Sequence, residues 1–242
     1  FALGGPIGAV AGAAFGHTFV DKKEDEYLRS IPGGQEQSGL SSNEQAQLIF
    51  FTAAFSMLAK VSKADGKVSP KEIQAVETFM NKDLQLDHES CETAKNIFRQ
   101  AVHSSEPFDA FARQFYSVFR TQPHIIDLML DVLFRVSTAD GGISREEETM
   151  IRSAFTIFNC SEADYQRFRS RYEKQTRPDF ATLKIDESAS DQAIKKQYRA
   201  LVSEYHPDKI QAKGLPEEFV KFANDKFREI QEAYDRIRKE RG

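Results

Sequence analysis

Apolar residues recur every three or four positions through residues 44–175, and this spacing constrains the fold more than any other feature of the chain. It places apolar side chains on one face of an α-helix, whereas a half-buried strand needs strict alternation, which this range does not show convincingly. Phenylalanine dominates the pattern, because 13 of the chain's 20 phenylalanines lie there. We therefore predict an all-α fold with seven helices in this range and a core built on phenylalanine.

Two stretches within this range repeat each other. Residues 58–72 read LAKVSKADGKVSPKE and residues 133–147 read LFRVSTADGGISREE, with identity at eight of fifteen positions. The repeat predicts two related helical halves. In each copy we expect a glycine to end one helix and a serine to cap the next, with a glutamate three residues later completing a capping box. These residues are Gly66, Ser69 and Glu72 in the first copy and Gly141, Ser144 and Glu147 in the second.

The repeated turns have a second interpretation, because D-G-x-[VI]-x-x-x-E resembles the second half of a calcium-binding EF-hand loop. Such a loop needs oxygen ligands at its first and third positions. The first copy has Val61 and Lys63 there, and the second has Val136 and Thr138. We therefore predict no EF-hand calcium site and commit to no metal ligand. Weak divalent-ion binding on the Asp-Gly loops stays open as an alternative.

Residues 1–20 contain no acidic or basic side chain. Four glycines at a spacing of four would form one smooth stripe on a helix, repeating the G-x-x-x-G pattern that lets membrane helices approach closely. They are Gly4, Gly8, Gly12 and Gly16. Because a spanning helix needs about 20 apolar residues, we expect a transmembrane helix that is truncated at its start and forms a homodimer through this stripe. A signal-peptide remnant or a flexible tail is the alternative.

The apolar run ends at the sequence DKK, and basic residues favour the cytoplasmic side of a membrane. We therefore expect a single membrane pass with the rest of the chain in the cytoplasm. Residues 21–43 are rich in charge, Gly, Ser and Gln without periodic apolar residues, and are predicted to be a linker. The predicted domains are then 44–175 and 176–242.

The C-terminal domain, 176–242, is predicted to be a helical hairpin. A short turn of helix opens it at 178–183, Ser190 caps a second helix that Pro207 ends, and Pro216 opens a third. Apolar positions on the second helix are Ile194, Tyr198, Leu201 and Tyr205, and those on the third are Phe219, Phe222, Ala223, Phe227, Ile230, Ala233, Tyr234 and Ile237. We expect the two rows to face inward and pack in an antiparallel hairpin.

The loop of the hairpin carries His206, Pro207 and Asp208. Proline fixes its own φ and pushes the preceding residue toward an extended conformation. The imidazole and the carboxylate are then held at the tip of the hairpin, where a rigid carboxylate suits bidentate pairing with an arginine of a partner.

Positive charge gathers on the second helix and just beyond it. Between residues 192 and 209 four basic residues face only two acidic ones, a local charge of +2 in a chain whose net charge is −4. The four are Lys195, Lys196, Arg199 and Lys209. Such a patch steers an acidic partner by electrostatics.

Nucleic-acid binding and catalysis are both disfavoured. Residues 177–242 hold 14 basic and 13 acidic groups, which is not the basic excess of a nucleic-acid binder. The His–Asp pair could form a catalytic dyad, but the sequence places no nucleophile or metal cluster beside it, so we predict that the chain is not an enzyme.

Both domains resemble known families. The middle domain, with paired K/T-A-D-G-x-V/I-S-x-x-E turns on a helical module, resembles the TerB-like fold, which implies an interaction or sensing module. The segment 178–238 has, in order, D-F-x-x-L-x-I, K-K-x-Y-R-x-L, the His-Pro-Asp loop and F-x-x-I-x-x-A-Y-x-x-I. It resembles the J domain of DnaJ-type co-chaperones. The resemblance implies that His206, Pro207 and Asp208 trigger ATP hydrolysis by a DnaK-type chaperone. ATP would bind the partner, so this chain needs no cofactor.

The order of the parts resembles the membrane-anchored DnaJ-like co-chaperones. That resemblance implies a bacterial inner-membrane protein, with cytoplasmic C-terminal domains, that dimerises through its membrane helix and recruits DnaK. The alternative is a membrane-tethered adaptor or sensor, in which the TerB-like domain recruits a partner or an ion and the J domain only delivers DnaK.

Overall fold

The computed structural model describes residues 4–14, 41–139, 141–172, 178–207 and 215–242. All regular structure in these ranges is helical, which confirms the predicted all-α fold. Most of the predicted linker lies outside these ranges. The predicted division between the domains at 175 and 176 stays a prediction.

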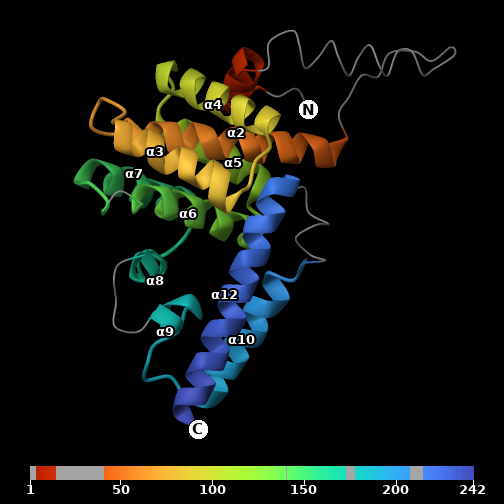
Figure 1. Ribbon diagram of the computed structural model, residues 1–242, viewed down its shortest axis with the longest axis vertical. Coiled ribbons are helices and arrows are strands. Elements are labelled where there is room, and N and C mark those ends of the chain that lie inside the picture. Colours follow the sequence, from red (N-terminus) through yellow and green to blue (C-terminus); the bar gives the residue numbers. More distant parts are fainter. Residues whose placement is uncertain (1–3, 15–40, 140, 173–177, 208–214) are drawn as a thin grey trace, which may run out of the picture.

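The middle domain, residues 41–172, is a bundle of seven α-helices in the part that is described, as the spacing of apolar residues predicts (Figure 1). A π-helical turn, η1 (Phe79–Asp83), extends the second of them. The seven are α2 (Ser42–Ser62), α3 (Pro70–Thr78), α4 (His88–His103), α5 (Phe108–Phe119), α6 (Pro123–Ser137), α7 (Arg145–Ile157) and α8 (Glu162–Tyr172).

Helices α2 and α6 form the centre of the bundle. Every residue of α2 from 50 to 62 is buried, and α6 is buried along nearly its whole length. From residue 50 onward α2 is apolar or small on nearly all sides, and a helix of that kind is stable only when other helices surround it. Helix α6 is mostly apolar and also carries Asp127, Asp131 and Arg135, which make ion pairs with other elements. Phe50, Phe55, Phe115 and Phe134 are all fully buried, so the core is built on phenylalanine as predicted.

The two repeated turns fold as the capping interpretation predicts. In the first, Glu72 N–H donates to Ser69 Oγ at 3.3 Å, and in the second, Glu147 N–H donates to Ser144 Oγ at 3.2 Å. Each glutamate also accepts from the N–H of its serine, which completes both capping boxes. The preceding glycines have φ values of +99° and +125°, a conformation that favours glycine. Both glutamates are therefore used in capping.

The C-terminal segment, residues 178–242, folds as a helical hairpin preceded by a short helix. The elements are α9 (Pro178–Thr182), α10 (Asp191–Glu204) and α12 (Glu217–Arg241). Tyr198 and Tyr234 stack across the hairpin with ring centroids 3.9 Å apart. The hairpin has its own apolar core, made of Phe180, Leu183, Ile194, Leu201, Tyr205, Ile230, Ala233 and Ile237.

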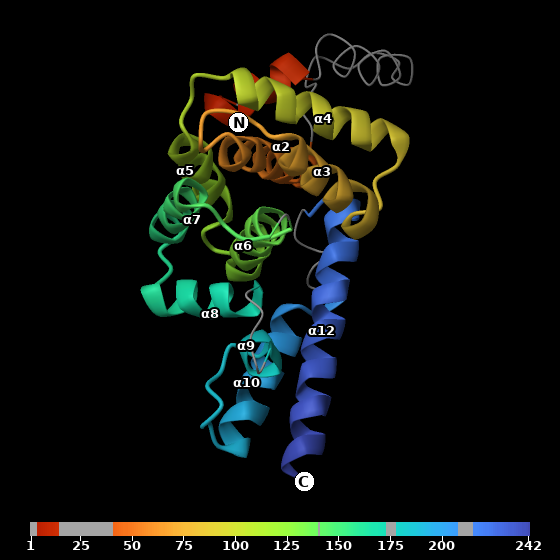
Figure 2. The same cartoon turned by 60° about the vertical axis from the view of Figure 1, so that its left-hand side comes forward.

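The first turns of α12 leave the hairpin and enter the middle domain (Figure 2). Phe219, Phe222 and Ala223, which the sequence analysis assigned to the hairpin, belong instead to the core of the middle domain. The reason is length. Helix α12 has 25 residues and α10 has 14, so at 1.5 Å per residue α12 extends about 16 Å farther. Helix α12 is thus shared between two cores.

The N-terminal residues 5–14 form a short helix against the middle domain. Ile7, Val10 and Ala11 are buried, whereas Gly4 and Gly12 are exposed and Gly8 is half-buried. Gly16 lies outside the described residues. Among the helices of the described ranges, none has the length and apolar character needed to cross a bilayer. The membrane helix and its glycine-mediated dimer stay predictions.

Candidate functional site

The site predicted at the tip of the hairpin is described as far as Pro207. Helix α10 begins where Ala193 N–H donates to Ser190 Oγ at 3.3 Å and ends at Glu204. His206 follows and is exposed, and Pro207 is half-buried. Asp208 and Lys209 lie outside the described residues.

Two aromatic residues hold the turn that carries His206. The imidazole lies edge-to-face on the Phe227 ring, with centroids 6.2 Å apart. Tyr205 is 2% exposed, and its N–H donates to Leu201 O at 2.9 Å. Burial, reinforced by the negative charges of Asp127 and Asp131, raises the pKa of the Tyr205 hydroxyl well above its usual value. Tyr205 is therefore uncharged, and its buried ring anchors the turn that carries His206.

The anchor also lies against the middle domain. Lys184 Nζ is 6.0 Å from the centre of the Tyr205 ring and makes an ion pair with Asp127 of α6. Both partners of that pair are mostly buried, with side chains 16% and 17% exposed. The start of the His-Pro-Asp loop is thus supported from the hairpin on one side and from α6 on the other.

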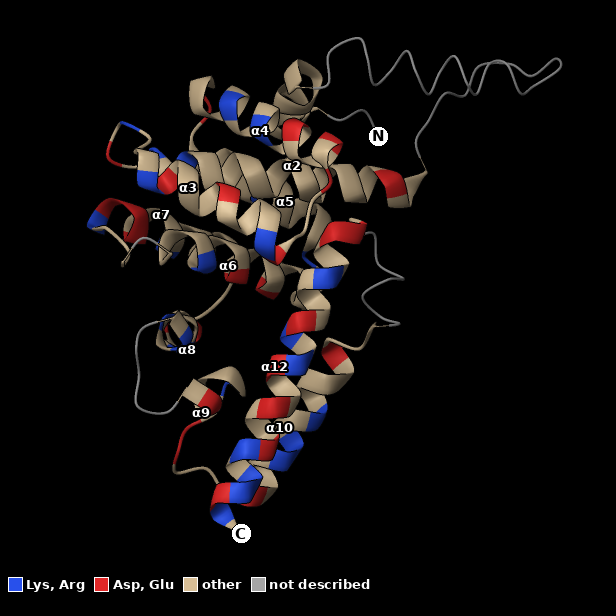
Figure 3. Ribbon diagram, viewed as in Figure 1, with Lys and Arg blue, Asp and Glu red and all other residues tan. Residues whose placement is uncertain are grey.

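The predicted basic face is on the surface of α10 (Figure 3). Lys195, Lys196 and Arg199 are all exposed, and Lys195 and Arg199 share a face because they are four residues apart. Within the described ranges, no ion pair engages any of the three. These charges are therefore available to a partner molecule.

A buried ionic cluster joins the two domains behind this site. Asp131 of α6 pairs with Arg171 of α8 through an Oδ1–Nη1 distance of 2.8 Å and lies 3.7 Å from Lys226 Nζ of α12. The Tyr172 hydroxyl donates to the same carboxylate oxygen at 2.8 Å. The carboxylate is 1% exposed, and the two cationic side chains are each 9% exposed.

The cluster keeps its carboxylate ionised. Burial alone would raise the pKa of Asp131, but the charges of Lys226 and Arg171 and the Tyr172 hydroxyl outweigh it, so that pKa is lowered. Burial opposes the charge of Lys226, but Asp131, Tyr172 and Glu229 together outweigh that effect, so the pKa of Lys226 is raised. The cluster is therefore a mutually dependent set of charges at the domain interface.

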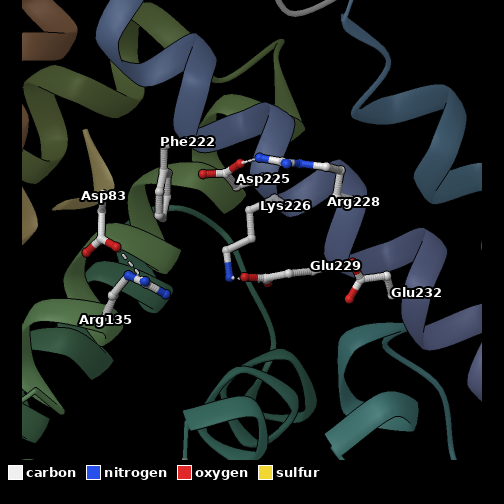
Figure 4. Close-up of a pocket in the computed structure, with 8 residues that line it drawn as sticks. All are labelled: Asp83, Arg135, Phe222, Asp225, Lys226, Arg228, Glu229 and Glu232. Atoms are coloured by element: carbon white, nitrogen blue, oxygen red, sulfur yellow. Dashed lines mark hydrogen bonds and ion pairs between the residues drawn. The ribbon is translucent and has the colours of Figure 1, made fainter. Parts of the chain in front are cut away.

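A cavity of about 270 Å³ lies beside this cluster, between α12 and the middle domain (Figure 4). It is lined by Asp83, Arg135, Phe222, Asp225, Lys226, Arg228, Glu229 and Glu232. Its charged groups are already paired, as in Asp83–Arg135 at 2.5 Å and Lys226–Glu229 at 3.0 Å. The cavity is therefore part of the interface and leaves no charge unused for a ligand.

Among the described residues, no group of three or more His, Cys, Asp or Glu side chains could hold a metal ion. The site consists of an exposed imidazole on a turn anchored by Tyr205 and Phe227, and a row of exposed cations on the adjoining helix. Such a surface is suited to binding another macromolecule.

Comparison with known proteins defines the class. The family model described as "Tellurite resistance protein TerB" matches residues 51–170, and the model described as "DnaJ domain" matches residues 180–241. The chain is thus a J-domain protein that also carries a TerB domain, and both resemblances drawn from the sequence are confirmed.

Curated relatives narrow the class to one family. A protein of Coxiella burnetii named "Co-chaperone protein DjlA" is 30% identical over 260 positions, which cover all of this chain and 94% of the relative. Proteins of the same name from Photobacterium profundum and Escherichia coli K12 are 29% and 27% identical and are covered over 95% and 93% of their lengths. No solved structure matches significantly. The chain belongs to the DjlA family of co-chaperones.

Proposed function

We propose that this chain binds a DnaK-type chaperone through its His-Pro-Asp loop and the basic face of α10, and stimulates ATP hydrolysis by that chaperone. The observation that carries the proposal is the position of His206, which is exposed on a turn anchored by Tyr205 and Phe227. The imidazole is thereby held at the surface, where a partner can reach it. ATP binds the partner, and this chain contributes no catalytic residue of its own.

Within this proposal each part of the site has a separate role. Lys195, Lys196, Arg199 and Lys209 attract an acidic surface and set the docking orientation, which makes association sensitive to salt. Asp208 pairs with an arginine of the chaperone. His206 and Pro207 hold that carboxylate at the tip of the loop.

The test is the ATPase rate of a DnaK-type chaperone with the full chain added. The wild-type chain should accelerate hydrolysis, and His206→Gln should abolish the acceleration. His103→Gln is the matched control, because His103 is another exposed histidine at the end of α4. The proposal fails if the wild-type chain has no effect, or if both variants stimulate equally.

We further propose that the protein acts at the cytoplasmic face of a bacterial inner membrane and is a dimer there through Gly4, Gly8, Gly12 and Gly16. Support comes from the charge-free run 1–20 and from the DjlA family membership. Replacing Gly8 and Gly12 by leucine should weaken dimers in a bilayer reporter assay. Unchanged dimerisation would count against the glycine stripe.

A further inference from the structure

The turn that carries His206 is connected to the middle domain through Lys184. This residue follows α9, a helix that contacts both α8 of the middle domain and α12 of the hairpin (Figure 2). Lys184 Nζ pairs with the Asp127 carboxylate of α6 and lies 6.0 Å from the centre of the Tyr205 ring. Tyr205 directly precedes His206 and is 2% exposed. One lysine thus joins a carboxylate of the middle domain to the ring that anchors the turn.

The backbone at Lys184 has a conformation that a lysine rarely adopts. Its φ is +54°, in the left-handed region that glycine and asparagine favour. The turn is fixed by two main-chain hydrogen bonds, in which Lys184 N–H donates to Ala181 O and Ile185 N–H donates to Phe180 O, both at 3.0 Å. A strained backbone persists only where the surrounding contacts determine it. Glycine or asparagine would fit this backbone better, but neither could make the ion pair with Asp127.

The segment that follows the His-Pro-Asp loop is fixed on the middle domain as well. Leu215 is 2% exposed within the apolar core of that domain, and its carbonyl oxygen accepts from Gln47 Nε2 of α2 at 3.2 Å. Ser90 Oγ of α4 donates to Glu218 Oε1 at 3.3 Å. Only residues 208–214 separate this segment from the turn described above. The middle domain therefore holds the chain on both sides of those residues.

We propose that the middle domain takes part in chaperone activation, because Asp127 of α6 positions the His206 turn through Lys184 and Tyr205. Asp127 and Lys184 are positioning residues in this scheme, and neither contacts the chaperone. The inference rests on the proposed function, since it concerns how well the loop acts once a DnaK-type chaperone is bound. The basic face lies earlier on α10, so docking through that face does not depend on the pair.

Loss of the Asp127 charge would release Lys184. The lysine side chain is only 16% exposed and lines a small cavity with Arg171 and Lys226, two cations that already pair with Asp131. A mostly buried cation that has lost its own anion is strongly unfavourable. The ammonium would therefore move toward water, away from the ring that anchors the turn.

The test titrates variants of the full chain into a DnaK-type chaperone and separates the maximal ATPase rate from the concentration that gives half of it. Asp127→Asn should lower the maximal acceleration roughly tenfold, because small misplacements of a functional group are costly, and should leave the half-saturating concentration unchanged. Asp127→Glu keeps the carboxylate and should restore most of the acceleration. Lys184→Asn should act like Asp127→Asn, even though asparagine suits the backbone. Asp83→Asn is the matched control, because that carboxylate is also 17% exposed and pairs with an arginine inside the middle domain.

A second measurement needs no chaperone. Nuclear magnetic resonance of the imidazole Cε1–H groups should show the His206 signal shifted by Asp127→Asn and unshifted by Asp83→Asn, with His103 unchanged in both. If the wild-type chain does not stimulate the chaperone, the proposed function fails, and the His206 signal still decides whether Asp127 positions the turn. Where the wild type stimulates, an Asp127→Asn chain with the wild-type maximal rate would overturn the proposal. So would an unshifted His206 signal, or an equal loss with Asp83→Asn.

Discussion

Truncating Phe219 to alanine should loosen both domains at once, because α12 is shared between their cores. Phe219 is 0% exposed, and its ring centroid lies 4.7 Å from that of Phe50. Three more phenylalanine rings lie within 6.1 to 6.4 Å. Removing a buried phenylalanine costs about 3–5 kcal/mol, and this dense ring packing places Phe219 near the upper end. That is a large fraction of a typical total stability of about 5–15 kcal/mol.

Hydrogen exchange followed by mass spectrometry measures the local stability of each domain separately. A loss of about 3–5 kcal/mol raises the opening constant by roughly two to three and a half orders of magnitude, since about 1.4 kcal/mol is a factor of ten. We expect faster exchange in α2 of the middle domain and also in α10 of the hairpin, which Phe219 does not contact. Lys221→Ala is the control, because Lys221 is exposed on the same helix and should change neither. If α10 keeps its protection while α2 loses it, α12 does not couple the domains.

Three further predictions concern the buried ionic cluster, the second capping box and the basic face of α10. Asp131→Asn leaves Arg171 and Lys226 as buried cations, so urea denaturation should show a loss of about 3–5 kcal/mol; a loss below about 1 kcal/mol would contradict the cluster's role. Because the folded pKa of Asp131 is lowered, its stabilisation is present above the unfolded value of about 3.9 and is lost as pH falls through the folded pKa. In a plot of Tm against pH, Tm should therefore fall less at acid pH in Asp131→Asn than in the wild type. Ser144→Ala should cost about 1 kcal/mol in thermal unfolding, and Ser144→Thr much less, because threonine keeps the cap; equal losses would argue against capping. Reversing Lys195 and Lys196 to glutamate should slow association with a DnaK-type chaperone at low salt, with a smaller difference at high salt; a salt-independent effect would exclude steering.

The repeated turns could be predicted because their chemistry is local. A serine followed three residues later by a glutamate, after a glycine, is enough to define a capped turn whatever packs around it. Both copies fold as that pattern indicates, with Ser69 and Ser144 in matching capping boxes. The all-α fold follows in the same way from spacing along the chain.

The division of α12 between two cores could not be predicted from its sequence. Its apolar positions form one continuous row, and a row of apolar side chains does not tell which surface covers it. Two signals were present. Helix α12 is longer than its partner α10, and Lys226 is a charge at an inward position between Phe222 and Ile230. A buried lysine needs a buried anion, and the structure supplies it as Asp131, 95 positions earlier in the chain.

The N-terminal helix shows the same limit. Its composition predicts that residues 5–14 avoid water, but both a lipid bilayer and a protein groove satisfy that requirement. The choice in the structure depends on Gln114, which lies 107 positions from Ile7 and carries no local signal. Asp208, the other half of the functional loop, rests on the sequence motif alone because it is outside the described residues.

Activation of a DnaK-type chaperone by the His-Pro-Asp loop can be measured as the single-turnover rate at which that chaperone hydrolyses bound ATP while the full chain is titrated in. We expect a rate that rises and saturates with the wild-type chain and stays at its basal value with His206→Gln. A His206→Gln chain that stimulates as strongly as the wild type would contradict it.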